Sequence, residues 1–345
     1  MEQFLRDIPQ VLGHPFIALI VITALLFDFV NGFHDAANSI AIIVGTRVMK
    51  PFAAVIWAAF WNFAAMWVFG FAVANTVAKW VHIDYVNPDV IFAGLIGAII
   101  WNLITWWGGL PSSSSHALLG GICGAAIAYA GHFAGVLNNG SVIKTVEFII
   151  LAPLIGLILG HILMLLMLWA CRRANPRAVE RSSHYLQIAT AAAYSLGHGT
   201  NDSQKTIGII SALLFTQIWK AEKPDIHAHE WIAVACFTVI GIGTMAGGWR
   251  IIRTMGMKIA RLRAHSGAVA SGAGALTLFL STWLGIPVST THTITGAIMG
   301  VGSVQRVSAV RWGVGRNIVM AWVLTIPASA IMGAICVKIV PLLHH

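Results

Sequence analysis

Charged residues are scarce in this chain of 345 residues. Asp, Glu, Lys and Arg together make up 10% of the sequence, whereas soluble globular proteins carry about 25%. This shortage excludes an ordinary soluble protein, and the gaps between the apolar runs leave no room for a sizeable soluble domain. Hydrophobic residues make up 58% and the mean hydropathy is +0.81. The composition therefore predicts a polytopic membrane protein.

Cysteine is also rare. The four cysteines have no C-x-x-C or paired spacing and lie in or at the ends of apolar runs: Cys123, Cys171, Cys236 and Cys336. This excludes a disulfide framework and a cysteine metal site, and we expect no cofactor and no resident metal ion. A cleaved signal peptide is not expected either, because the N-terminus has no basic stretch and no A-x-A site.

Long apolar runs fill most of the chain. Runs near the length of about 20 residues that spans a bilayer as a helix occur at 16–30, 51–78, 90–107, 146–171, 231–249 and 317–340. A helix satisfies its own backbone hydrogen bonds in lipid. The expected fold class is therefore all-α, with several membrane-spanning helices.

Basic residues outnumber acidic ones by 21 to 12. They lie in short loops, where membrane topology places positive charge, so we expect the lipid bilayer as a partner and no nucleic acid. With the N-terminus outside, the inside segments carry Arg47, Lys50, Arg172, Arg173, Arg177, Arg181, Arg250, Arg253, Lys258, Arg261, Arg263, Arg306, Arg311 and Arg316. The outside segments carry only Arg6, Lys79, Lys144, Lys220, Lys223 and Lys338. The sequence leaves open a homo-oligomer and a cytoplasmic regulatory protein, which the basic loop 250–263 would contact.

Two motifs each occur twice. Residues 109–122, GLPSSSSHALLGGI, match residues 285–298, GIPVSTTHTITGAI, and residues 32–41, GFHDAANSIA, match residues 199–208, GTNDSQKTIG. The chain is therefore interpreted as two transmembrane repeats, 1–180 and 181–345. The charge bias starts the first copy outside and the second inside, so the repeats are inverted, as in secondary transporters. Each repeat is expected to hold an interrupted helix and a re-entrant helical hairpin, with Pro111 or Pro287 stopping the helix before the hairpin tip.

Four ionisable residues other than histidine remain at membrane depth: Asp28, Asp35, Asp202 and Lys205. A charge at the centre of a span costs about 2.5 to 3.5 kcal/mol on insertion scales, so such groups are interpreted as functional. Asp28 precedes Asp35 by seven residues, or two helical turns, and the two carboxyl groups should share a face.

The hairpin tips supply donors for an anion. Six hydroxyl groups precede helices that should start near His116 and His292: Ser113, Ser114, Ser115, Ser289, Thr290 and Thr291. Free backbone N–H groups and the positive dipole end at such helix starts favour an anion, although serine and threonine are also ordinary helix caps. Asn38, Asn201 and Lys205 add further polar groups. His116 and His292 are interpreted as hairpin supports that bond to neighbouring carbonyl groups.

Carboxylates beside an anion need a reason. Phosphate near neutral pH still carries a P–OH hydrogen, which a carboxylate accepts, whereas a fully ionised sulfate is repelled. Asp35, Asp202 and Asp28 would also bind the coupling cation. Oxygen ligands suit Na⁺ or Mg²⁺, and a buried aspartate suits H⁺.

Both duplicated motifs resemble the signatures of the inorganic phosphate transporter (PiT) family, over nearly the whole chain. The resemblance implies import of inorganic phosphate by cation symport, with phosphate held between the hairpin tips and the two aspartate motifs. Lys205 stands where the sodium-coupled branch has asparagine, as at Asn38. This resembles the bacterial low-affinity branch, which is thought to move phosphate or a neutral metal phosphate, such as one with Mg²⁺, with protons. The resemblance implies a multi-pass protein of the bacterial inner membrane and not an enzyme.

Two hypotheses for Lys205 stay open. Its ammonium group takes the place of one sodium ion, with Asp28 or Asp35 carrying the transported proton, or it is a static counterion of Asp202 three residues away. Three rival functions are a sulfate permease of the same fold, a structural scaffold, and an intramembrane metal-dependent hydrolase built on His34, Asp35, His198 and Asp202. The hydrolase lacks an HExxH cluster, and catalysis leaves the duplication unexplained.

Overall fold

The computed structural model describes residues 2–220, 225–248, 251–252, 255 and 259–343. Within these ranges the chain is helical and forms no β-strand, which confirms the predicted all-α class. The α-helices are α1 (Glu2–Leu12), α2 (Pro15–Gly45), α3 (Pro51–Ala64), α4 (Ala72–Val77), α5 (Pro88–Trp107), α6 (Ser114–Ala130), α7 (Asn139–Cys171), α8 (Pro176–Gln217), α9 (Trp231–Ala246), α11 (Ala264–Trp283), α12 (Thr290–Gln305) and α13 (Trp312–Ile339). Short 3-10 helices cover Ala65–Trp67, Ile83–Tyr85, Ile226–His229, Val307–Ala309 and Val340–Leu343.

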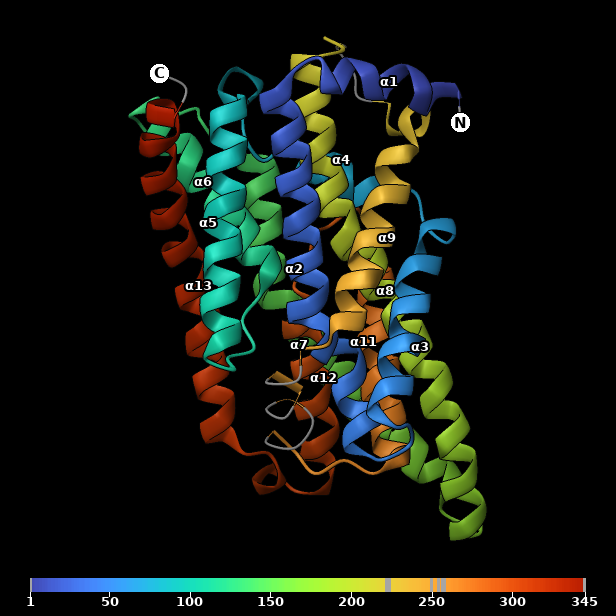
Figure 1. The fold of residues 1–345 in the computed structure, drawn as a ribbon. Helices are drawn as coiled ribbons and strands as arrows, with labels where there is room; N and C mark the ends of the chain where they lie inside the picture. Colours follow the sequence, from blue (N-terminus) through green and yellow to red (C-terminus); the bar gives the residue numbers. More distant parts are fainter. Residues whose placement is uncertain (1, 221–224, 249–250, 253–254, 256–258, 344–345) are drawn as a thin grey trace.

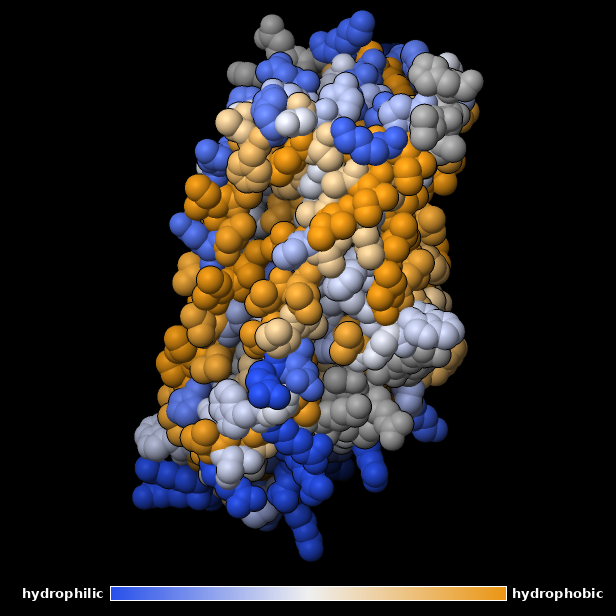
Figure 2. Space-filling model, turned by 90° about the vertical axis from the view of Figure 1, so that its left-hand side faces the viewer, coloured by the Kyte–Doolittle hydropathy of each residue, from blue (hydrophilic) through white to orange (hydrophobic). Residues whose placement is uncertain are grey.

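The apolar surface is that of a membrane protein. Among the described residues, four helices are long and apolar enough to cross a bilayer: α2, α5, α7 and α13. They contain the predicted runs 16–30, 90–107 and 146–171 and nearly all of 317–340. The visible face is hydrophobic over its middle and hydrophilic at both ends (Figure 2), as expected for a chain embedded in lipid.

The run 51–78 is not one helix, so the expectation of a single span there is wrong. Helix α3 ends at Ala64, and a 3-10 turn and a loop separate it from α4. The side chain of Gln204 on α8 holds this break. Its Oε1 accepts from the backbone N–H groups of Val73 (2.9 Å) and Ala74 (3.2 Å), and its Nε2 donates to the carbonyl of Gly70 at 2.8 Å. These bonds satisfy backbone groups that a broken helix leaves without partners.

The two motif helices are uninterrupted, which corrects the expected helix breaks. Helix α2 passes through residues 32–41 and α8 through residues 199–208 as continuous α-helix. Neither motif contains proline, and the polar side chains of both are buried in protein, so their presence requires no break in the backbone. The two helices run in opposite directions (Figure 1) and contact each other.

The backbone breaks lie in two helical hairpins. In Figure 1, α5 descends from the upper end and α6 returns to it, whereas α11 rises from the lower end and α12 returns to it. Residues 108–115 and 284–291, from the turn that ends one helix to the first residues of the next, form the two tips. Glycine stops the preceding helix in each hairpin, not Pro111 or Pro287 as expected. Gly109 (φ 63°) and Gly285 (φ 67°) adopt the left-handed conformation of a helix C-cap.

The two caps use the same hydrogen bonds. The N–H of Gly109 donates to the carbonyl of Trp106 and that of Leu110 to Thr105, each at 2.9 Å. The N–H of Gly285 likewise donates to Thr282 (3.0 Å) and that of Ile286 to Ser281 (2.8 Å). This is the six-to-one and five-to-two pattern of a Schellman cap. The duplicated sequence thus ends both helices in the same way.

Two apolar clusters surround the polar motifs. One cluster includes buried residues of α2 up to Val30 and of α8 from Ile207 onward. The other includes buried residues of α2 from Ala37 onward and of α8 up to Tyr194. The intervals between them hold His34 and Asp35 on α2 and the polar residues from His198 to Thr206 on α8, and Asn38 follows directly after Ala37. Packing therefore places the buried polar groups between the clusters, in the interior of the molecule.

Several basic loops gather at one end of the molecule. In Figure 1 both termini lie at the upper end, and the α2–α3, α7–α8 and α12–α13 connections lie at the lower end. These connections carry Arg47, Lys50, Arg172, Arg173, Arg306 and Arg311. Arg250, Arg253 and Lys258 of the loop predicted to contact a regulator lie outside the described residues, as does Lys223.

Candidate functional site

Both motif helices and both hairpin tips meet around Lys205. Its side chain is 1% exposed, and its ammonium nitrogen lies 2.5 Å from Asp202 Oδ1, 2.5 Å from Ser115 Oγ and 2.8 Å from the carbonyl of Val288. An ammonium group has three hydrogens to donate, so these contacts use all of them. Lys205 joins α8 to the tips of both hairpins, and its contact with Asp202 fits both hypotheses for its role.

Asn38 occupies the matching position on α2 and contacts the second hairpin. Its Nδ2 donates to Thr291 Oγ1 at 2.9 Å and to Thr290 Oγ1 at 3.2 Å. Thr290 Oγ1 in turn lies 3.4 Å from Asp202 Oδ2 as a donor, and its carbonyl accepts from the Tyr194 hydroxyl at 2.9 Å. The predicted residues Asn38, Thr290, Thr291 and Asp202 are therefore in one network.

Asn201 holds the second hairpin tip in place. Its Nδ2 donates to the carbonyl of Ile286 (3.2 Å) and to Thr282 Oγ1 (3.3 Å), and its Oδ1 accepts from the N–H of Val288 at 3.1 Å. These bonds occupy both ends of the amide. In this structure Asn201 positions the tip, and its predicted place among the substrate-binding residues stays a prediction.

Ser113 and Ser289 are helix caps, as the alternative reading of the serine clusters anticipated. Ser113 Oγ accepts from the N–H of His116 at 3.2 Å and Ser289 Oγ from that of His292 at 3.3 Å. Helices α6 and α12 accordingly start at Ser114 and Thr290, two residues before the expected histidines. Accepting a hydrogen bond leaves each hydroxyl hydrogen available to a ligand.

His34 links Asp35 to the first hairpin. Its Nδ1 lies 2.6 Å from Asp35 Oδ1, and its Nε2 lies 3.2 Å from Thr105 Oγ1. Thr105 donates its own hydrogen to the carbonyl of Trp101 at 3.0 Å. His34 therefore lies between Asp35 and the first hairpin. Ser114 Oγ is 3.4 Å from the same imidazole.

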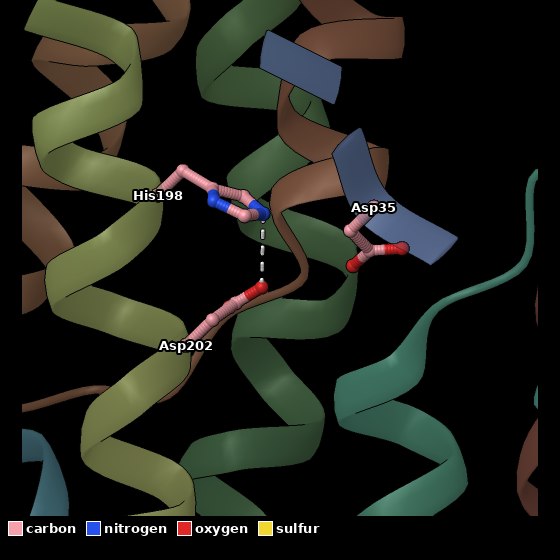
Figure 3. A group of neighbouring side chains, drawn as sticks. All are labelled: Asp35, His198 and Asp202. Carbon is pink, nitrogen blue, oxygen red and sulfur yellow. Dashed lines mark ion pairs between the residues drawn. The ribbon is translucent and has the colours of Figure 1, made fainter. Parts of the chain in front are cut away.

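Asp28 lies apart from Asp35, although both are buried on α2. Asp28 Oδ1 accepts from Thr206 Oγ1 on α8 at 2.9 Å, and its Oδ2 is buried with no hydrogen-bond partner. A separate group combines Asp35 with His198 and Asp202, whose ligand atoms lie within 4.8 Å of one another (Figure 3). These three are the described residues whose geometry suits a metal ion.

The two hairpins also touch through their histidines. The rings of His116 and His292 meet edge to face with centroids 4.4 Å apart, and His292 stacks on Trp322 of α13 at 3.7 Å. Both side chains are buried. Contact between the two rings ties α6 to α12, where hairpin supports would lie. Neither ring nitrogen of His116 has a hydrogen-bond partner, so the expected bond from this histidine to a neighbouring carbonyl group is wrong.

Sequence reasoning missed several residues of the site. Asn62 on α3, Tyr194 and Thr206 on α8, and Thr105 and Ser112 near the first tip all bond to predicted site residues or their partners. Asn62 offered a signal, as one of two amides in the apolar run 51–78, and Thr206 belongs to the second motif. Tyr194 carried no such signal, because aromatic residues are common in helices.

Known proteins with similar sequences cover nearly the whole chain. It is 51% identical over 327 residues to a probable low-affinity inorganic phosphate transporter of Rhizobium meliloti (strain 1021), which covers 94% of this chain and 96% of that protein. It is 46% identical over 324 residues to a protein of the same description from Bacillus subtilis (strain 168), covering 92% of this chain and 95% of the relative. These relatives are transporters, so the hydrolase is excluded and the chain is not an enzyme.

A solved structure shares the fold. The sodium-dependent phosphate transporter superposes with a TM-score of 0.83 at 23% sequence identity, over 95% of this chain and 99% of that one. Residues 31–181 and 170–333 each match the phosphate transporter family. The resemblance drawn from the two motifs is confirmed. This chain belongs to the phosphate transporter family.

Proposed function

We propose that this chain is a secondary transporter that imports inorganic phosphate by cation symport, with H⁺ favoured over Na⁺. The observation that carries the proposal is the buried ammonium of Lys205, bound to Asp202 and to both hairpin tips. A fixed cation there takes the place that a sodium ion would fill between oxygen ligands. The names of the Rhizobium and Bacillus relatives support phosphate as the substrate.

The architecture of the proposal is two inverted repeats, 1–180 and 181–345, each with a re-entrant hairpin. The opposite directions of α2 and α8, and hairpins that open toward opposite ends (Figure 1), support it. Two separate matches to the family support the duplication. The proposed boundary falls in the first turns of α8. Transport would proceed by alternating access to a site between the repeats.

Phosphate would bind between the hairpin tips. Ser113, Ser114 and Ser115 from one tip and Ser289, Thr290 and Thr291 from the other supply hydroxyl donors, next to the helix starts of α6 and α12. Asp202 lies beside the Thr290 hydroxyl, and Asp35 is linked to Ser114 through His34. Both carboxylates would accept the P–OH hydrogen of phosphate. Sulfate has no such hydrogen, which argues against the sulfate permease.

Asp28 is the better of the two candidates for the transported proton. Its second carboxylate oxygen is buried without a partner, whereas Asp35 Oδ1 is already bonded to His34 Nδ1 at 2.6 Å. Thr206, which holds Asp28, is next to Lys205 in sequence. Proton binding at Asp28 would therefore act on the helix that carries the ammonium group.

The location that fits this function is the inner membrane of a bacterium, with the basic loops in the cytoplasm. The bacterial relatives support it. Phosphate would enter alone or with a divalent ion such as Mg²⁺.

Uptake of radiolabelled phosphate into proteoliposomes tests the proposal. We expect accumulation when an inward H⁺ gradient is imposed without sodium, and none when an inward Na⁺ gradient is imposed at equal pH. Excess arsenate should compete and excess sulfate should not. Uptake that follows sodium and ignores pH would refute the coupling, and competition by sulfate would refute the substrate. The variant Lys205→Asn gives both motifs asparagine at this position, as at Asn38, and its phosphate uptake should become dependent on sodium.

A further inference from the structure

Two apolar grooves run along the lower part of α8, on the outside of the molecule. One groove, of about 440 Å³, lies between α8 and α3 and is walled by Trp57 and Trp61. The other, of about 520 Å³, lies between α8, α7 and α11 and is walled by Leu166 and Phe279. Ala193 lines both grooves, so they meet on α8. In Figure 1 this part of α8 lies beside α3, toward the lower end of the molecule.

Both grooves are suited to hydrocarbon. The rim of the second groove carries leucine side chains that the protein leaves exposed, among them Leu186 and Leu276. The floor of the first groove on α8 includes the small residues Ala189 and Ala192, so it is recessed between larger side chains. An acyl chain lying in a groove is contacted from several sides, and these van der Waals contacts add up. The grooves therefore offer a lipid chain more contact than a flat helix face would.

The length of the first groove matches one leaflet of a bilayer. On α8 it extends from Tyr185 to Leu196, which is about 16 Å at a helical rise of about 1.5 Å per residue. Half of the hydrocarbon core of a bilayer is about 15 Å thick. Tyr185 is 69% exposed, and exposed tyrosine is typical of the boundary between membrane and water. The lower end of the groove therefore lies at the level of the lipid headgroups.

Two arginines continue the same face of α8 beyond Tyr185. Arg181 precedes Tyr185 by four residues and Arg177 precedes Arg181 by four, so the three residues lie on one side of the helix. Both arginines are exposed, and within the described part of the chain neither guanidinium group has an acidic partner. The nearby acid Glu180 lies 3.5 Å from His184 instead. Two uncompensated positive charges thus follow the end of the groove.

Membrane topology accounts for positive charge at this end of the chain, but not for its place on the face that the groove occupies. Arg172, in the preceding connection, lies 4.9 Å from the centre of the Trp169 ring and so has a partner within the protein. The guanidinium groups of Arg177 and Arg181 have the geometry to bind phosphate oxygens in pairs. Basic clusters directly beyond a membrane-spanning helix are typical sites for anionic lipids.

We propose that the lower part of α8 binds one anionic phospholipid, with its phosphate at Arg177 and Arg181 and one acyl chain in each groove, on the two sides of Ala193. A lipid with net negative charge is favoured because the protein leaves the two guanidinium groups unneutralised, whereas a zwitterionic headgroup brings an ammonium group of its own. The lipid would pack against α8 directly before the second motif, 199–208. Its binding does not depend on the proposed transport of phosphate.

Native mass spectrometry of the purified full chain counts the lipids that stay bound. We expect one phosphatidylglycerol per chain to be retained in the presence of excess phosphatidylethanolamine. Loss of one arginine should weaken binding about 5-fold, and Arg177→Gln/Arg181→Gln about 25-fold. Arg316→Gln is the matched control, because it removes an exposed arginine from α13, outside both grooves, and should leave binding unchanged.

A second variant tests the groove without changing the charge. Ala189→Trp fills the space between α8 and α3 and should also release phosphatidylglycerol, whereas Ala53→Trp, at an exposed alanine of α3 outside the groove, should not. Equal retention of the two lipids would overturn the site, as would unchanged binding in the arginine double variant or in Ala189→Trp. A lipid-free dimer that Ala189→Trp converts to a monomer would assign the grooves to a second copy of the chain and also overturn it. If a variant does not fold, the competition between the two lipids on the natural chain decides.

Discussion

The ammonium of Lys205 on α8 lies 2.5 Å from the hydroxyl of Ser115 at the first hairpin tip, and Asn38, at the matching position on α2, donates to Thr291 at the second tip. Each motif helix thus bonds to the hairpin of the other proposed repeat. A movement of either hairpin disturbs a buried polar contact with the motif helix of the other proposed repeat.

Removing the ammonium should destabilise the protein. Lys205→Met leaves Asp202 buried without its 2.5 Å partner, and breaking a buried ion pair costs about 3 to 5 kcal/mol. We expect a lower melting temperature in detergent and loss of phosphate uptake. The double variant Lys205→Met/Asp202→Asn should recover stability without uptake. Lys144→Met, at an exposed lysine, is the control, and an unchanged melting temperature for Lys205→Met would contradict the pairing.

Asp28→Asn should separate transport from proton coupling. An amide keeps the acceptor for Thr206 Oγ1 (2.9 Å) and cannot bind a proton reversibly, so the fold should be retained. Proteoliposomes should still exchange internal for external phosphate but no longer accumulate it in response to a pH gradient. Asp84→Asn, outside the membrane-spanning helices, is the matched control. If Asp28→Asn accumulates phosphate at the natural level, another group carries the transported proton.

The serine caps should contribute equally in the two hairpins. Ser113→Ala and Ser289→Ala each remove the acceptor for one helix N–H group, which costs about 1 kcal/mol. Chemical denaturation of the purified variants measures the change, with Ser308→Ala at an exposed turn as control. If phosphate also contacts these hydroxyls, uptake should fall further than stability predicts. A loss in only one of the two variants would argue against equivalent tips.

The left-handed glycines make a second matched pair. Gly109→Ala and Gly285→Ala force a side chain into positive φ, at about 1 to 2 kcal/mol each. Thermal unfolding should show a loss for both, larger for Gly285→Ala, because the added carbon there also meets Ala72 at 3.2 Å. Gly313→Ala, in the first turn of α13 with no atom within 4 Å of the added carbon, should be neutral or slightly stabilising. An equal change in melting temperature for all three variants would refute the capping role of Gly109 and Gly285.

The sequence predicted the elements that repeat and missed those that depend on distant packing. The motifs identified both serine clusters, both aspartates and Lys205, because charge in an apolar run is costly and therefore conspicuous. The roles of these residues stay predictions. Helix continuity through 32–41 and 199–208 was not predictable from polarity, since burial against protein removes the reason for a break. His198 bonds to Asn62, 136 residues away, and no local pattern carries that information.

The unbroken course of α2 and α8 has a mechanical consequence. A rigid rod that tilts about its middle swings its two ends in opposite directions. Both helices bear their buried polar contacts near the middle of the molecule. A tilt about that point would widen the space between each helix and its neighbours at one surface of the bilayer and narrow it at the other surface. A helix broken at the motif would bend there and lose this leverage.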